Sequence, residues 1–138
     1  TWRDEDGVER PKYVLSFWFE WCACTAFWPV NGAAEERFDV GPIAPEELPL
    51  SVATQERVRA LSEWHDRSLN WDYPPDPGPW REEECLRFNA AARELYDTAV
   101  RELGVAFALL FAAHEEHEDP DLDAYLRDPM RFRRSGYQ

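Results

Sequence analysis

Thiol and imidazole side chains are the groups in this chain of 138 residues that could act as nucleophiles or metal ligands. In an extended strand, Cys22 and Cys24 would place both sulfurs on one side, where thiolates could ligate a soft metal. No second such pair accompanies them, and we expect inert cysteines that are buried or half-buried. Cys85 falls on the apolar stripe of a predicted helix, which favours core packing over a nucleophilic role. The spacing specifies no catalytic pair with His65 or His114.

The densest group of titratable side chains follows the last predicted strand. Ten positions hold two imidazoles and six carboxylates, namely His114, Glu115, Glu116, His117, Glu118, Asp119, Asp121 and Asp123. Solvent, counterions or a cationic partner must relieve the repulsion among these carboxylates. Three interpretations follow: a solvated, flexible exit segment, a docking surface for a basic protein, or a metal site that uses His114 and His117. The histidine spacing differs from the metalloprotease pattern, so we expect no bound metal.

Aromatic side chains are also unusually frequent, because seven tryptophans exceed what one small core ordinarily uses. Several lie in or beside a proline-rich connection, where they either cover the gap between two helices or stay exposed. Exposed aromatic rings beside acidic residues are typical of protein interfaces. We predict a partner-binding surface that contains Trp18, Glu20, Trp71, Tyr73, Trp80, Glu115, Glu116, Glu118, Asp119, Asp121 and Asp123.

The charge balance restricts the class of partner. The chain has 15 Lys and Arg residues against 28 Asp and Glu residues, a formal net charge of −13 and an isoelectric point near 4.6. Nucleic acids and anionic membranes are poor partners for such a surface, whereas a basic protein surface suits it. Neither a phosphate-binding loop nor a dinucleotide fingerprint is present, and we expect no cofactor.

Other sequence features concern the compartment. No apolar run approaches the roughly 18 residues of a membrane span. The first residues contain neither the basic region nor the apolar stretch of a secretion signal. Three cysteines, an odd number, suggest no disulfide framework. We therefore expect a cytoplasmic protein.

Two segments have the pattern of β-strands that would position these side chains. In residues 13–21 every odd position is bulky and apolar, which predicts a strand with one buried face. The opposite face carries Trp18 and Glu20 and is free to meet water or a partner. Residues 105–113 contain no charge and alternate bulky with mostly small side chains, which predicts an interior strand.

The segment between residues 25 and 50 contains many turn-forming residues. These residues exclude a long helix and permit only short strands. The dipeptide Asn31-Gly32 is a hairpin signal, which would join short strands near residues 27–30 and 37–40.

Two amphipathic helices are predicted in the second half of the core. Ser51 is the expected N-cap of a helix that continues to about Ser68. A second helix should run from near Trp80 to Leu103, with three glutamates in its first turn and Gly104 at the left-handed position after its end. Its apolar residues have helical spacing, and they are Cys85, Phe88, Ala92, Leu95, Ala99 and Leu103.

These elements predict one α+β domain over residues 1–138. It comprises a lead-in arm (1–11), a core (12–113) and an acidic, then basic, C-terminal segment (114–138). We expect a two-layer sandwich in which two amphipathic helices pack on one face of a small, mostly antiparallel sheet. A chain of this length can bury a sufficient core without disulfides or metal.

Several short motifs also resemble those of a known group of proteins. They are Leu48-Pro49-Leu50-Ser51, Leu61-x-x-Trp64, Asn70-Trp71, Arg87-Phe88-Asn89 and Glu102-Leu103-Gly104. Residues 12–113 are similar to small bacterial proteins, some of which accompany secreted polymorphic toxins as immunity proteins. The resemblance implies a non-enzymatic, cytoplasmic inhibitor that covers the active site of a toxin.

The leading hypothesis is thus an acidic protein-binding module, an immunity protein that neutralises a toxin by covering a positively charged active-site surface. The negative charge agrees with it, because enzymes that act on polyanions have basic clefts. One alternative is a small enzyme or metal-binding protein that uses Cys22 and Cys24, or His114 and His117. Another is a structural subunit whose open sheet face, with Trp18, docks a second chain.

Overall fold

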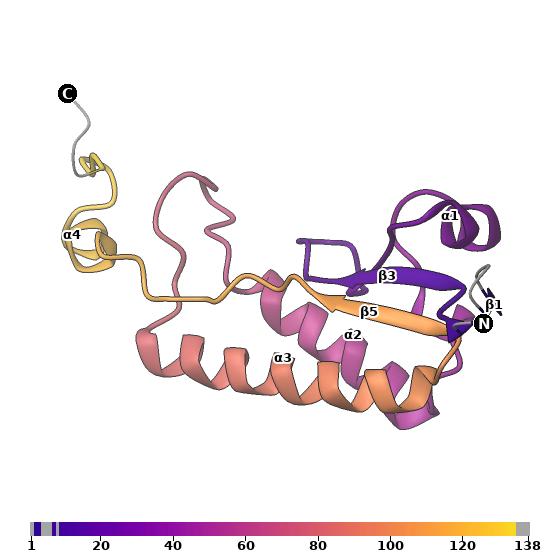
Figure 1. Ribbon diagram of the computed structural model, residues 1–138. Coiled ribbons are helices and arrows are strands. Elements are labelled where there is room, and N and C mark those ends of the chain that lie inside the picture. The colour runs from indigo at the N-terminus through magenta and orange to yellow at the C-terminus, as the bar shows by residue number, and fades with distance from the viewer. Residues whose placement is uncertain (1, 4–6, 8, 135–138) are drawn as a thin grey trace.

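The computed structural model describes residues 2–3, 7 and 9–134, which form short strands and four helices (Figure 1). The elements are β1 (Trp2–Arg3), β2 (Glu9–Arg10), β3 (Tyr13–Phe17), β4 (Phe27–Pro29), α1 (Gly32–Phe38), a 3-10 turn (Pro45–Glu47), α2 (Val52–Asp66), α3 (Glu82–Leu103), β5 (Phe107–Phe111) and α4 (Leu122–Arg127). The predicted α+β class is confirmed, and the two-layer packing stays a prediction.

The main sheet has three strands in the order β4-β3-β5, with β3 at the centre. β3 pairs antiparallel with β4, where Phe17 lies opposite Phe27, and parallel with β5, where Phe17 lies opposite Phe111. The sheet is therefore mixed, and the prediction of a mostly antiparallel sheet is wrong. Parallel neighbours need a long crossover, and the helices between β4 and β5 provide it.

β5 is an edge strand, which corrects the prediction of an interior strand over residues 105–113. Leu109 is buried, whereas Leu110 and Phe111 are exposed. β4 already occupies the other side of β3, so β5 joins the sheet at its free edge.

The helices agree closely with their predicted limits. The hydroxyl of Ser51 accepts a hydrogen bond from the backbone N–H of Thr54, as an N-cap does. Gly104, with a φ of 77°, follows the last residue of α3. All six residues of the predicted α3 stripe are buried. In Figure 1 both long helices lie below the sheet. The rings of Phe17 on β3 and Tyr96 on α3 meet edge-on.

The predicted first strand ends at Phe17 instead of at residue 21. Cys22 and Cys24 have φ angles of 67° and 61°, and these left-handed residues turn the chain out of the extended conformation. The two sulfurs therefore do not line one side of a strand. Trp21, which we expected on the buried strand face, is 38% exposed in this turn.

Asn31 is the N-cap of α1, and the predicted hairpin at Asn31-Gly32 is wrong. Its side-chain oxygen accepts hydrogen bonds from the backbone N–H groups of Ala34 and Val14, and its amide donates to the carbonyl of Lys12. These bonds attach the start of α1 to the start of β3. Of the two strands predicted around this dipeptide, the one near residues 27–30 is present as β4.

Both ends of the chain contain more structure than predicted. Within the expected lead-in arm, β1 and β2 pair antiparallel, with Trp2 opposite Arg10. In the C-terminal segment, α4 begins at Leu122, within the end of the acidic run. Of these two predicted segments, residues 1, 4–6, 8 and 135–138 lie outside the described residues. Among the described residues, none of the helices combines the length and the apolar character of a membrane span.

Candidate functional site

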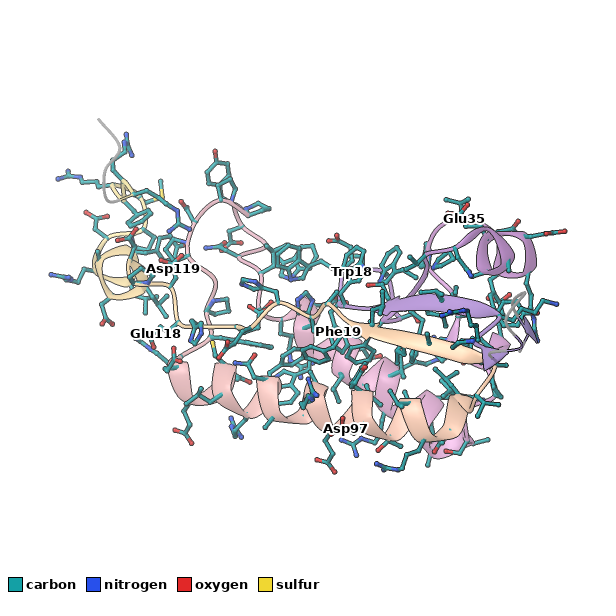
Figure 2. All side chains as sticks on the ribbon, in the orientation of Figure 1. Trp18, Phe19, Glu35, Asp97, Glu118 and Asp119 are labelled. Atoms are coloured by element: carbon teal, nitrogen blue, oxygen red, sulfur yellow. The ribbon has the colours of Figure 1, made fainter. Side chains whose placement is uncertain are left out.

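The acidic run of residues 114–123 lies against α2 and α3 (Figure 2). The side-chain amide of Asn89 on α3 donates to the carbonyl of Glu116 at 2.9 Å and accepts from its backbone N–H at 2.8 Å. The carboxylate of Glu116 lies 3.5 Å from Nε2 of the buried His65 on α2. The chain after β5 is therefore attached to both long helices.

The start of α3 and the acidic run cap each other. The backbone N–H of Glu82 donates to the carboxylate of Glu118, and the backbone N–H of Glu118 donates to the carboxylate of Glu82. The bond from Glu118 and the neighbouring His117 hold the pKa of Glu82 below its usual value. The hydrogen bond between Nδ1 of His117 and the carboxylate of Glu82, at 2.9 Å, raises the pKa of His117. A carboxylate at this helix N-terminus also meets the positive end of the helix dipole.

Two arginines neutralise most of the remaining carboxylates in the run. Arg81 lies 2.8 Å from Asp123 and 3.7 Å from Glu118. Arg134 contacts Asp119 at 2.8 Å and Asp121 at 3.4 Å, and both of these carboxylates are more than four-fifths buried. The predicted acidic surface is thus largely paired within the chain. Two carboxylates stay mostly exposed, those of Glu115 and Asp123.

The aromatic residues of the proline-rich connection differ in exposure. Trp71 and Tyr73 are more than half exposed, although the indole N–H of Trp71 donates to the carbonyl of Asp66 at 2.7 Å. Trp80 is buried and packs against the rings of Trp64 and Phe88. We predicted Trp80 as a partner-binding residue, but the structure places its side chain in the core.

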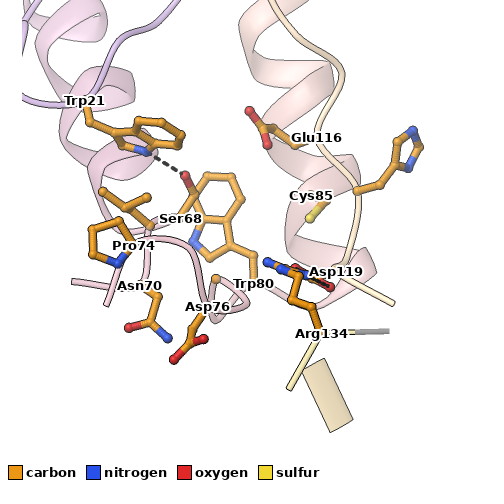
Figure 3. A pocket seen from close by; sticks show the side chains of 13 residues that line it. Trp21, Ser68, Asn70, Pro74, Asp76, Trp80, Cys85, Glu116, Asp119 and Arg134 are labelled. Carbon is orange, nitrogen blue, oxygen red and sulfur yellow. Dashed lines mark hydrogen bonds and ion pairs between the residues drawn. The ribbon is translucent and has the colours of Figure 1, made fainter. Parts of the chain in front are cut away.

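A hollow of about 210 Å³ separates the turn at Trp21, the proline-rich connection and the C-terminal segment (Figure 3). The indole N–H of Trp21 donates to the hydroxyl of Ser68 at its edge. Cys85 also borders the hollow. Burial, together with the neighbouring carboxylates, raises the pKa of this thiol to about 11. The thiol is therefore protonated at neutral pH, which agrees with its predicted packing role.

The residues predicted as alternative metal ligands lie at separate places. Cys22 and Cys24 are both exposed, which differs from the expected buried or half-buried thiols. The backbone N–H of Cys22 donates to Asp66. Over the described residues, no three side chains of His, Cys, Asp or Glu are grouped so that they could hold a metal ion.

His65 lies in an aromatic pocket between the sheet and the helices. Its ring stacks on those of Phe19 and Trp21 and also contacts Phe88. These contacts are those of a buried histidine packed among aromatic rings.

The side of the sheet that carries Trp18 has a pair of stacked indoles, for which the sequence contains no local signal. The rings of Trp18 and Trp28 are 4.2 Å apart and nearly parallel, and Nε1 of Trp28 donates to the carbonyl of Trp18. Both side chains are half-buried. Nearby in sequence, the exposed Glu20 accepts a hydrogen bond from the backbone N–H of Trp21. The register that pairs Ser16 with Trp28 creates this stack, and one strand pattern alone does not predict the register.

Comparison with known proteins places this fold in a family. The search of curated proteins gives no significant match. Residues 19–114, well over half of the chain, match the family described as Serratia CdiI immunity protein-like. The match includes β4, α1, α2, α3 and β5 and ends at the start of the acidic run. The chain belongs to the Serratia CdiI immunity protein-like family.

Proposed function

We propose that this protein neutralises a cognate toxin of contact-dependent inhibition by binding to it and covering a positively charged active-site surface. Membership of an immunity family supports toxin neutralisation in general, and it is the observation that carries the proposal. The net charge of −13 favours a basic partner, because opposite charges increase the rate of association and like charges disfavour binding. The protein acts in the cytoplasm as an inhibitor without catalysis of its own.

The exposed members of the predicted surface are the side chains that we propose for contact. They are Glu20, Trp71, Tyr73, Glu115 and Asp123. Trp71 and Tyr73 would serve as aromatic anchors, since large rings supply much of the contact energy at protein interfaces. Asp119 and Asp121 contribute less, because Arg134 already neutralises them.

Co-expression with the toxin domain encoded directly upstream tests the proposal. We expect the domain to arrest growth when expressed alone and to be harmless when this protein is present. The two proteins should also co-purify as a stable complex. Arrest that persists at equal expression of both proteins would contradict the proposal. A toxin domain from an unrelated system is the control, and it should remain toxic.

A further inference from the structure

The two faces of the sheet have different surroundings. On one face of β3, Tyr13, Leu15 and Phe17 are all buried. On the other face, Val14 and Ser16 are only half-buried. Figure 2 shows Trp18 above the sheet and Phe19 below it, toward the long helices. The long helices α2 and α3 therefore cover one face, and the other face, at whose end α1 lies, is partly open.

The open face has a continuous row of side chains across all three strands. Ser16 at the centre lies opposite Trp28 on β4 and opposite Leu110 on β5. Side chains that are paired in register point to the same face of a sheet. The adjacent Trp18 stacks on Trp28, and Leu110 is 50% exposed. The row has a small side chain in the middle and large apolar side chains at both sides.

The nitrogen donors of the two stacked tryptophans on this face already have partners within the chain. The indole N–H of Trp28 donates to the carbonyl of Trp18 at 3.0 Å, and the backbone N–H of Trp18 donates to Ala26. Burying a polar group that has no hydrogen-bond partner costs free energy. Donors that are already hydrogen-bonded can therefore be buried against a partner without bridging water. A protein that packs on this face would leave neither of these donors unpaired.

We infer that this open sheet face, consisting of Val14, Ser16, Trp18, Trp28 and Leu110, is the apolar part of the toxin-binding surface and receives an apolar patch rimmed by Lys or Arg. The inference rests on the proposed function and adds to it the place and the chemistry of the contact. An apolar centre with a polar rim is the usual composition of a protein interface.

Charge selects the occupant of this face. Glu35 on α1 lies on the same side of the sheet as Trp18 in Figure 2, and Glu20 follows Trp18 by two residues. Both carboxylates are exposed, and within the described residues neither forms an ion pair. A second copy of this chain would bring another net charge of −13 and would be repelled. A basic toxin domain is attracted instead.

Substitution of Leu110 tests the inference on the intact protein with its cognate toxin domain. Leu110→Arg and Leu110→Glu add charges of opposite sign at the same exposed position. Leu86→Arg is the matched control, because Leu86 on α3 is 53% exposed and belongs to the helical layer. Affinities are measured by titration calorimetry, and circular dichroism confirms that each variant is folded.

We expect Leu110→Arg to weaken toxin binding by about tenfold or more. Leu110→Glu should weaken binding less, since its charge attracts a basic rim, and Leu86→Arg should bind like the wild type. Hydroxyl-radical footprinting of the unmodified complex needs no variant, and it should show protection of Trp18 and Trp28 but not of Leu86.

Unchanged affinity of folded Leu110→Arg, or unprotected indoles in the complex, would overturn the assignment of this face. The proposed function would survive both results, because the wild type would still bind the toxin. Failure of the wild type to bind would instead refute the proposed function. Light scattering tests whether a second copy of this chain binds the face instead. A stable homodimer that Leu110→Arg dissociates would assign the face to a second copy and overturn the inference.

Discussion

Nη1 of Arg134 lies 2.8 Å from a carboxylate oxygen of Asp119. The guanidinium of this arginine, near the end of the described chain, therefore forms an ion pair with the acidic run. The same guanidinium donates to the carbonyl of Pro75 through Nε and Nη2, at 3.1 and 2.8 Å. This arginine therefore joins the C-terminal segment to the proline-rich connection. It also reduces the negative charge that Asp119 can present to another protein.

Replacement of Arg134 by glutamine should loosen the C-terminal segment without unfolding the protein. A partly exposed ion pair contributes at most about 1 kcal/mol to the free energy of unfolding. We expect faster backbone amide exchange in residues 116–127 and a nearly unchanged melting temperature. Arg133→Gln is the control, because the exposed Arg133 donates to the neighbouring carbonyl of Phe132 and has no ion pair with another described residue. Equal exchange rates in the two variants would show that Arg134 does not hold the segment.

Gly78 should not tolerate a side chain, because the proline-rich connection packs closely on the end of α2. A Cβ atom at Gly78 would lie 2.1 Å from the backbone oxygen of Ser68. We expect Gly78→Ala to lower the free energy of unfolding by about 1–3 kcal/mol, as other overpacked substitutions do. Gly32→Ala is the control, since a Cβ there meets nothing within 4 Å. Equal urea midpoints for the two variants would refute the close approach.

Glu102 connects the end of α3 to the start of α2. Its carboxylate accepts hydrogen bonds from the backbone N–H and hydroxyl of Ser51 and from the hydroxyl of Thr54. The bond from the Ser51 N–H is the main cause of its lowered pKa. This stabilisation is therefore present above pH 4.5, the usual carboxyl pKa, and is lost as the pH falls through the lowered value.

We expect Glu102→Gln to cost about 1–2 kcal/mol in unfolding free energy at pH 7, measured by urea titration, because a charge-assisted bond is replaced by neutral ones. Glu94→Gln is the matched control on the same helix. Glu94 is 3.7 Å from Arg57 and mostly exposed, so its loss should cost less than about 0.5 kcal/mol. A smaller effect at Glu102 than at Glu94 would contradict this role.

The ion pair between His117 and Glu82 should make stability depend on pH. The pKa of His117 is raised above its ordinary 6.5, so its stabilisation is fully present below 6.5 and disappears as the pH rises through the raised value. The pKa of Glu82 is lowered from 4.5, so its contribution is lost as the pH falls through that lowered value. The pair stabilises the fold between these limits.

His117→Gln tests this pH dependence. The difference in unfolding free energy between wild type and variant should be largest from pH 5 to 6 and should vanish at alkaline pH. Salt should reduce the difference, because both side chains are exposed enough to be screened. A difference that is constant from pH 5 to 9 would mean that the contact does not involve charge.

The sequence predicts best those features that depend on neighbours along the chain. The period of 3.6 identified the buried stripe of α3, and the serine before a breaker-free stretch identified the N-cap of α2. Both signals lie within one helix. They do not depend on how the helices and strands are arranged in space.

The predictions that failed depend on contacts between distant segments. Asn31 caps α1 and holds Val14, seventeen residues away, so its local hairpin signal was overridden. The parallel register of β5 follows from the crossover and has no local signal. Arg134 lies 13 and 15 residues from its carboxylate partners, and the pattern of the acidic run does not indicate them.

The rate of association with the cognate toxin domain tests the central claim most directly. We propose that the negative surface of this protein meets a basic toxin surface, and such steering weakens as salt shortens the range of the field. Stopped-flow measurements should show the association rate constant falling by about tenfold or more between roughly 0.02 and 0.5 M salt. A rate constant that stays the same over this range would contradict the account.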